Sequence, residues 1–191
     1  MHQAKKANEQ IILGIDPGTT IMGYGVIRCV GKKVEMIEMG ALHLSKYPDH
    51  AVKLKRIFDR CVSLIESHAP DQLAVEAPFF GKNVQSMLKL GRAQGVALAA
   101  ALSHEIPVAE YAPRKIKQSV TGSGSASKEQ VAAMVARTLK IPSEAMPKEL
   151  DASDGLAVAL CHHYQLASPR MQSGYSGWKA FVADQADRVK G

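Results

Sequence analysis

The stretch IILGID, residues 11–16, decides the fold of this chain. This short apolar run is followed by Pro17 and Gly18, a pattern that predicts a buried strand leading into a tight turn. The strand ends on Asp16, and apolar strands seldom end on acids for reasons of packing. Asp16 is therefore a candidate for a chemical role, together with Glu76, which ends a second apolar run at residues 73–76.

The segments that follow predict a sheet that begins with three antiparallel strands. Residues 22–30 alternate in polarity, Gly31 and Lys32 form a turn, and residues 34–44 give the third strand. Loops this short join antiparallel neighbours. Later strands are expected at residues 73–76 and 106–111, and helices at residues 49–68, 83–104, 113–120, 127–140 and 150–166, with Ser125 or Ser127 as a cap of the fourth helix. This order predicts an α/β domain with a mixed sheet of five strands.

The length of 191 residues suits one domain with a full core. We expect that domain at residues 11–167, with a flexible extension at residues 1–10. Residues 168–191, which include Trp178, are expected to form a peripheral or mobile tail.

The composition narrows the class of partner and the compartment. A net charge of +6 favours a polyanion, either nucleic acid or an anionic membrane surface. The sequence contains neither an apolar run of the ~18 residues that a membrane span needs nor a secretion signal, which predicts a cytoplasmic protein. Cys29, Cys61 and Cys161 form no CxxC pair and are expected to be small core residues in a reducing compartment.

Four carboxylates form the candidate active site. Asp16 and Glu76 each end a strand, and neighbouring strands lie about 4.8 Å apart, so the two acids would repel unless a cation lay between them. Asp151 and Asp154 share one face at the start of a helix. Such oxygen donors suit Mg²⁺ or Mn²⁺, and two such ions can promote phosphodiester cleavage. Taken singly, the acids have simpler interpretations: a turn residue for Asp16, a surface acid for Glu76 and a helix cap for Asp151.

Five segments, in this order, resemble the bacterial RuvC Holliday-junction resolvases. They are GIDPGTTIMGYGVI (14–27), LAVEAPFFGKN (73–83), SMLKLGRAQGVALAAA (86–101), EYAPRKIKQSVTGSGSASKEQV (110–131) and DASDGLAVAL (151–160). The resemblance covers residues 11–166. It implies an RNase H-like fold and a homodimer that resolves four-way DNA junctions by paired cuts in recombination and DNA repair. It also implies two Mg²⁺ ions per site, with Mn²⁺ as a substitute, and a RuvA–RuvB branch-migration complex as partner. The family's catalytic and metal-binding carboxylates match Asp16, Glu76, Asp151 and Asp154.

Basic residues around the loop at 122–127 are the candidate DNA contacts. Arg114, Lys115, Lys117 and Lys128 suit phosphate binding, which positions DNA without reading its sequence. The resemblance implies that Lys117 and Lys128 bind junction DNA near the active site. A solvated basic helix face is the alternative.

Aromatic and basic residues after Glu76 are further candidates for DNA contact. Phe79 and Phe80 could stack on unpaired bases, and the resemblance implies this role for Phe79. Core packing is the alternative for either ring. Lys82 precedes the long helix and is assigned to the same DNA-binding set.

Gly91 and Gly95 lie on one face of the helix at 83–104, where glycine lowers helix stability. We expect the close approach of another backbone there, and the resemblance implies a dimer interface. Packing against the sheet is the alternative. His162 and His163 follow Asp154 by about two turns, and we expect them at the helix surface rather than beside the metals.

Three other functions remain as alternatives. GIDPGTT is similar to the first phosphate loop of actin-like and heat-shock-chaperone ATPases, but the later half contains no second such loop. A ribonuclease H-type enzyme on RNA–DNA hybrids would share the carboxylates but lack the flanking motifs. A non-catalytic junction-binding protein would have no need of the complete carboxylate set.

Overall fold

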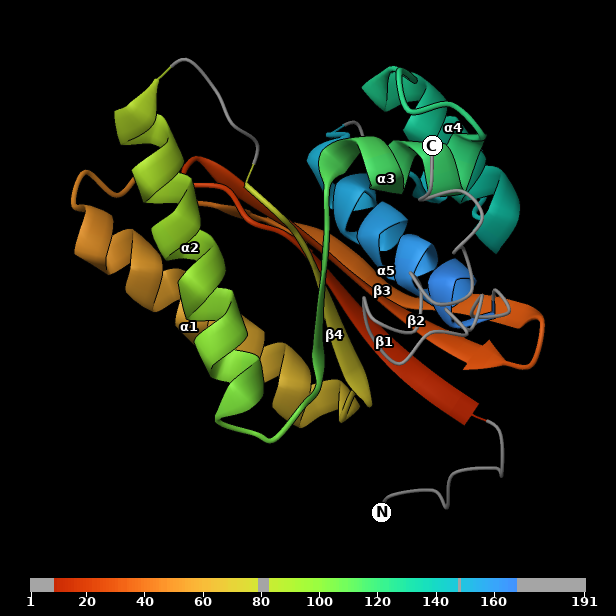
Figure 1. Ribbon diagram of the computed structural model, residues 1–191, viewed down its shortest axis with the longest axis horizontal. Coiled ribbons are helices and arrows are strands. Elements are labelled where there is room, and N and C mark those ends of the chain that lie inside the picture. Colours follow the sequence, from red (N-terminus) through yellow and green to blue (C-terminus); the bar gives the residue numbers. More distant parts are fainter. Residues whose placement is uncertain (1–8, 79–82, 148, 168–191) are drawn as a thin grey trace, which may run out of the picture.

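The computed structural model describes residues 9–78, 83–147 and 149–167, which form a mixed five-stranded sheet with helices on both faces (Figure 1). The strands lie in the order β3-β2-β1-β4-β5; β1, β2 and β3 pair antiparallel, whereas β4 and β5 run parallel to β1. The predicted fold class is therefore confirmed. The strands are β1 (Glu9–Asp16), β2 (Ile21–Val30), β3 (Lys33–His43), β4 (Gln72–Glu76) and β5 (Val108–Tyr111).

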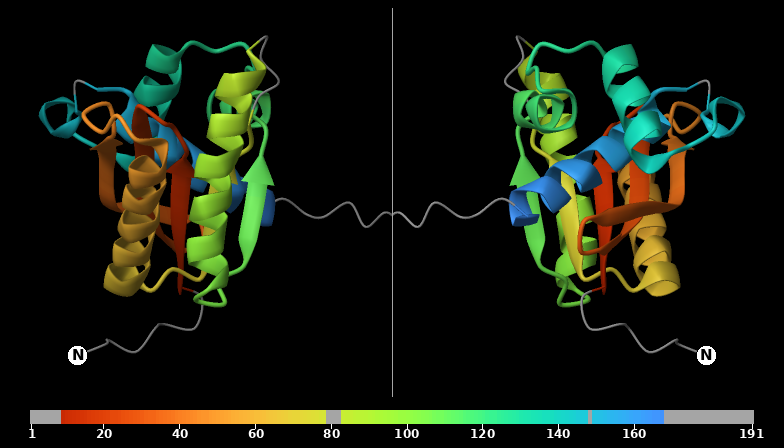
Figure 2. Two further views of the ribbon diagram at one scale, coloured as in Figure 1. Left: turned by 90° about the vertical axis from the view of Figure 1, so that its left-hand side faces the viewer. Right: turned by 90° about the vertical axis from the view of Figure 1, so that its right-hand side faces the viewer.

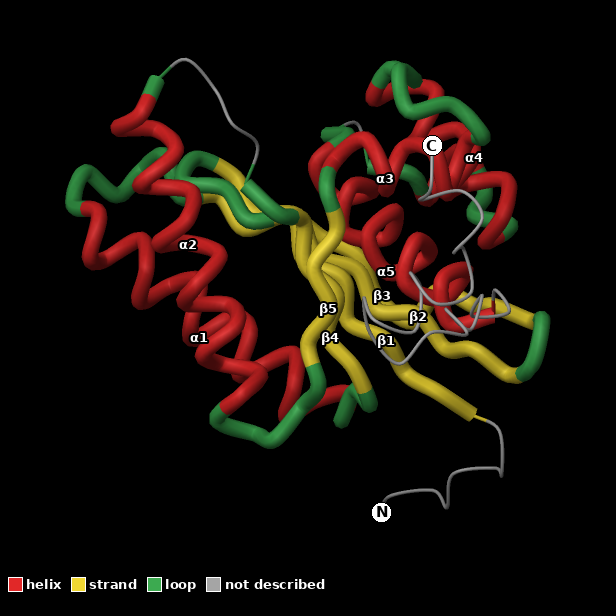
Figure 3. Tube along the Cα trace, viewed as in Figure 1, coloured by secondary structure: helices red, strands yellow, loops and turns green. Residues whose placement is uncertain are grey.

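The helices form two layers, one on each side of the sheet (Figures 2 and 3). One layer contains α1 (His50–His68) and α2 (Val84–Leu102), and the other contains α3 (Pro113–Thr121), α4 (Lys128–Leu139) and α5 (Asp151–Ala167). A short 3₁₀ helix, Ser143–Ala145, precedes α5. Ile12 packs in the core under α5, and Leu13 packs in the core under α1 and α2. This alternation along β1 determines which face each later side chain takes.

The observed first and last residues of the strands and helices agree with the expected ones to within about two residues. The expected flexible extension at residues 1–10 is wrong at Glu9 and Gln10, which pair with Val30 and Cys29 at the start of β1. The pairing of β1 with β2 continues past the apolar run, and an ion pair between Glu9 of β1 and Arg28 of β2, at 3.0 Å, stabilises this polar end. Ser127, not Ser125, caps α4, and its capping box with Gln130 is complete.

The three cysteines are buried and free, as expected for small core residues. Burial raises the pKa of Cys29 to about 11 and that of Cys61 to about 12, which keeps both thiols protonated and unreactive. None of the helices in the described part of the chain combines the length and the hydropathy that crossing a membrane would need.

Candidate active site

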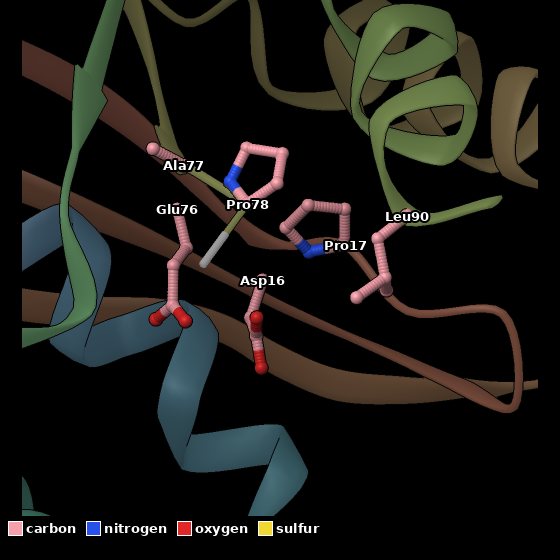
Figure 4. A pocket seen from close by; sticks show the side chains of 6 residues that line it. All are labelled: Asp16, Pro17, Glu76, Ala77, Pro78 and Leu90. Carbon is pink, nitrogen blue, oxygen red and sulfur yellow. The ribbon is translucent and has the colours of Figure 1, made fainter. Parts of the chain in front are cut away.

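Asp16 and Glu76 lie next to each other at one edge of the sheet. Strands β1 and β4 are parallel, and their last paired residues are Ile15 and Val75, so the acid that follows each of them occupies the same level. Ile15 and Val75 point into the α1–α2 core, and the strand alternation therefore turns both acids toward α5. Figure 4 shows the two carboxylates side by side near the blue ribbon of α5.

A cavity of about 310 Å³ opens beside these two acids. Its walls come from the ends of β1 and β4 and from α2, which contributes Leu90 (Figure 4). The remaining lining residues are Asp16, Pro17, Glu76, Ala77 and Pro78.

Asp151 and Asp154 occupy the first turn of α5, where the helix dipole favours negative charge. The side chain of Asp154 is 14% exposed and that of Asp151 is 33% exposed. Both acids lie close enough to Asp16 for their charges to raise its pKa. The structure therefore brings together all four carboxylates predicted from the sequence, from three separate segments of the chain.

The pKa values of three of these acids are raised, which indicates that the site has too little positive charge to balance its carboxylates. Burial, followed by the charges of Glu76 and Asp154, raises the pKa of Asp16 well above its ordinary value. Burial and the charge of Asp154 likewise raise the pKa of Glu76 to about 7. Burial also raises the pKa of Asp154, although Lys128 opposes this shift. Each shift reports a carboxylate that would be stabilised by a nearby cation.

Lys128 supplies positive charge to this cluster by direct contact. Its ammonium nitrogen donates to Asp154 at 2.8 Å and to Asp151 at 3.4 Å. Burial alone would lower the pKa of Lys128, but the hydrogen bond and charge of Asp154 raise it overall, so the side chain remains protonated. The ammonium group of Lys128 therefore contacts two of the carboxylates that the sequence predicts to bind metal.

The residues fit a hard divalent cation by their chemistry, because all four donors are carboxylates and the pKa values of Asp16, Glu76 and Asp154 are raised. In the part of the chain that the structure describes, no three acidic, histidine or cysteine side chains already form a group that could hold one ion. Asp151 and Asp154 are instead directed to Lys128. Binding of a metal would therefore require their carboxylates to turn.

A set of glycines that the sequence analysis did not single out holds α5 against the sheet. A Cβ added to Gly23 would lie 2.0 Å from the carbonyl oxygen of Asp151, and one added to Gly14 would lie 2.2 Å from that of Gly155. Gly25 and Gly155 are equally crowded, with backbone atoms of α5 and β2 at 2.6 and 2.4 Å. The available signal was glycine inside a strand, which marks the close approach of another backbone. We call Gly14, Gly23, Gly25 and Gly155 the glycine seam.

The basic residues after β5 lie on the same side of the sheet as the carboxylates. Lys117 and Lys128 both lower the pKa of Glu76 by their charge. Arg114 is exposed on α3, and its side chain packs against Gly124 of the loop that leads to α4. Phe79, Phe80 and Lys82 lie outside the described residues.

The expectation that His162 and His163 lie at the helix surface is wrong. They are only 5% and 8% exposed, because α5 is covered by the sheet on one side and by α3 and α4 on the other. His162 hydrogen-bonds the hydroxyl of Tyr111 at 2.7 Å and the amide oxygen of Gln72. His162 therefore belongs to a buried network that joins Gln72, at the start of β4, to Tyr111, which pairs with Glu76 at the end of that strand. Burial lowers the pKa of both histidines, which favours their neutral forms.

Removing the charge of Glu76 should stabilise the metal-free protein at high pH. The folded-state pKa of Glu76 is about 7 and the ordinary value is 4.5, so the folded protein holds a proton that the unfolded chain releases between these values. Stability therefore falls as pH rises through this range. We expect Glu76→Gln to increase the unfolding free energy in EDTA by on the order of 1–2 kcal/mol at pH 8 and to leave it nearly unchanged at pH 4. Denaturant unfolding measures this difference, with the exposed Glu66→Gln as control; a gain of equal size at both pH values would contradict it.

Comparison with known proteins agrees with this geometry. The sequence profile of the family described as crossover junction endodeoxyribonuclease RuvC matches residues 12–162. The RuvC of Bacteroides fragilis is 63% identical over 182 residues, which cover 95% of this chain and 97% of that protein. The RuvC of Porphyromonas gingivalis is 56% identical over 185 residues, with coverage of 95% and 98%.

Solved structures show the same fold. Thermus thermophilus RuvC in complex with Holliday junction substrate aligns with a TM-score of 0.74 at 32% identity, covering 82% of this chain and 94% of that one. The RNase H-like fold is thereby confirmed. On the matched length and identity, this chain belongs to the RuvC family of crossover junction endodeoxyribonucleases.

Proposed function

We propose that this RuvC-family endonuclease resolves four-way DNA junctions with two Mg²⁺ ions held by Asp16, Glu76, Asp151 and Asp154. Family membership implies dependence on a divalent metal. The observation that carries the assignment of residues is that Asp16 and Glu76, at one sheet edge beside a cavity, lie near Asp151 and Asp154 on α5, so that the charges of the other three acids all raise the pKa of Asp16. Manganese has similar ligand preferences and should substitute for magnesium.

The four carboxylates occupy different positions around the proposed metal site, and these positions suggest their roles. When bound, two such ions activate a water molecule and stabilise the leaving oxygen of the cut phosphodiester. Asp16 interacts electrostatically with each of the other three acids, which suits it to be the ligand shared by both ions. Glu76 lines the cavity from the adjacent strand, and Asp151 and Asp154 approach from α5.

The basic residues supply the DNA-binding surface in this proposal. Lys117 and Lys128 are close enough to affect the pKa of Glu76, so a phosphate bound by them would lie near the carboxylates. Arg114, on the first turn of α3, extends this surface. Phe79 remains a proposed contact on the grounds of base stacking and the resemblance, and Lys82 on the grounds of its charge and its position before α2.

Loss of Lys117 should weaken junction binding and reduce its dependence on salt. Each phosphate contact contributes close to one unit to the slope of log affinity against log salt concentration, so Lys117→Ala should lower the slope by about 0.7–0.9. Fluorescence anisotropy with Ca²⁺ in place of Mg²⁺ measures the slope. Lys32→Ala, at the exposed β2–β3 turn on the opposite end of the sheet, is the control. Equal slopes in both variants would mean that Lys117 does not bind phosphate.

We further propose that the protein acts as a homodimer through the outer face of α2. Its inner face is formed by Ala93 and Ala97, which are fully buried. At Gly91 and Gly95, an added Cβ would meet no described atom within 4 Å beyond the backbone of its own helix, which argues against packing of these glycines on the sheet. They continue an exposed apolar row at helical spacing that also includes Val84, Leu88 and Leu102, which are 64%, 52% and 63% exposed. A RuvA–RuvB complex remains the further partner that the resemblance implies.

A bulky residue in this row should dissociate the dimer. Gly95→Leu has open space within its own chain, so any loss of association would arise between protomers. Light scattering at micromolar concentration should show the monomer, and a two-strand nicking assay should show loss of paired cuts. Ala133→Leu, at an exposed position of α4, is the matched control and should remain dimeric. A wild-type protein that is monomeric even with junction DNA would contradict the proposal.

The function itself is tested by a comparison of substrates. With Mg²⁺, the wild-type protein should cut a four-way junction at paired positions and leave a linear duplex and an RNA–DNA hybrid largely intact. Preferential cutting of the hybrid would favour the ribonuclease H-type alternative. Binding of the junction without any cutting would favour a non-catalytic protein.

A further inference from the structure

Lys128 has an unusual place for a cation. It is the first residue of α4, whose start is fixed by the Ser127 capping box. The amino-terminal end of a helix carries partial positive charge, so a lysine there is electrostatically unfavourable by itself. Here the side chain crosses to the start of α5, where the contacts with Asp154 and Asp151 compensate.

The contact involves two of the four proposed metal ligands. The charge of Asp16 also raises the pKa of Lys128, so the ammonium group interacts with three of the four acids. The charge of Lys117 also lowers the pKa of Glu76 and Asp154, but no ion pair of Lys117 is seen among the residues that the structure describes. Within the described part of the chain, two of the four carboxylates, those of Asp154 and Asp151, are therefore directed to one ammonium group.

We propose that Lys128 is the resident counter-ion of the metal-free site and that metal binding displaces its ammonium from Asp154 and Asp151. This inference rests on the proposed function, because it takes these acids as metal ligands. A single ammonium compensates one charge among four acids, whereas a divalent cation compensates two and can bind several oxygens at once. The metal should therefore win the exchange, at a cost in affinity equal to the lost ion pair.

The exchange also places a free ammonium beside the site once metal is bound. Lys128 would then be available for the phosphate of the DNA. In the absence of metal it lowers the repulsion among the acids, which stabilises the folded chain.

Metal binding by Lys128→Met provides the test. We expect isothermal titration calorimetry of Mn²⁺ into the full-length protein to give about three- to tenfold tighter binding than in wild type, since the competing ion pair is absent. Lys117→Met removes the same charge from the same neighbourhood without removing an ion pair, and its gain should be clearly smaller. Asp154→Asn should bind Mn²⁺ more weakly than wild type.

Thermal unfolding supplies a second measurement. In EDTA, Lys128→Met should melt at a lower temperature than Lys117→Met, and saturating Mn²⁺ should raise its melting temperature by more than it raises that of wild type. Equal Mn²⁺ affinities in Lys128→Met and wild type, or equal gains in both lysine variants, would overturn the exchange while leaving the metal site intact. Absence of Mn²⁺ binding by wild type would overturn the proposed function and the exchange together.

Discussion

Asp16→Asn is expected to reduce junction cleavage by about a thousandfold or more and to leave junction binding largely unchanged. Asp16 ends the central strand and interacts electrostatically with the other three acids. Loss of a ligand shared by two metal ions should remove several kcal/mol of transition-state stabilisation, and each 1.4 kcal/mol corresponds to a tenfold change in rate. Removal of one negative charge should, if anything, ease the approach of a phosphate.

The measurement is single-turnover cleavage of a four-way junction, paired with anisotropy for binding. Asp59→Asn is a suitable control, because Asp59 is a surface acid paired with Lys55 on α1. If the Asp16→Asn enzyme cut at more than about a tenth of the wild-type rate, the assignment of Asp16 as a metal ligand would be wrong.

The sequence predicts most of this site because the acids are marked by position. Asp16 and Glu76 end buried strands, and parallel pairing of β1 and β4 is enough to bring them together. Asp151 and Asp154 are three residues apart at the start of a helix, which places them on one face. The local sequence pattern therefore predicts each pair of acids, and only the approach of α5 to the sheet edge depends on the tertiary fold.

The burial of His162 and His163 was not predictable in this way. Helix α5 is buried on nearly all sides, so it lacks the polar stripe that identifies the exposed face of an ordinary helix. The partner of Lys128 was equally hidden, since 23 residues separate it from Asp151 and only the packing of α4 on α5 brings them into contact. The strand glycines of the glycine seam indicate the close approach of another backbone, but the sequence does not show that this backbone belongs to α5.

The glycine seam links the packing of α5 to catalysis. Asp151 is held through its own carbonyl group, which lies where a side chain at Gly23 would be. The position of two proposed metal ligands is thus set by the absence of side chains on β1 and β2. A change in the seam should disturb the active site without altering any of its acids.

Gly23→Ala is therefore expected to lower both stability and cleavage. The new methyl group would lie 2.0 Å from the Asp151 carbonyl oxygen, which is backbone and cannot move aside without a shift of the first turn of α5. Overpacking of this kind should cost about 1–3 kcal/mol of unfolding free energy. A ligand displaced by about an ångström should reduce cleavage by about a hundredfold.

Ala133→Ser is the control, because it adds one heavy atom at an exposed position of α4, outside both the glycine seam and the proposed dimer face, and should cost about half a kcal/mol or less. Denaturant unfolding and single-turnover cleavage should be measured for both variants at a temperature at which both are folded. If folded Gly23→Ala kept cleavage within about twofold of wild type, the first turn of α5 would not need its close contact with β2 to position Asp151 and Asp154. If instead Mn²⁺ affinity and cleavage fell together in the folded variant, the loss would trace to displaced ligands rather than to unfolding, because unfolding would lower the folded fraction without changing the affinity of the molecules that remain folded.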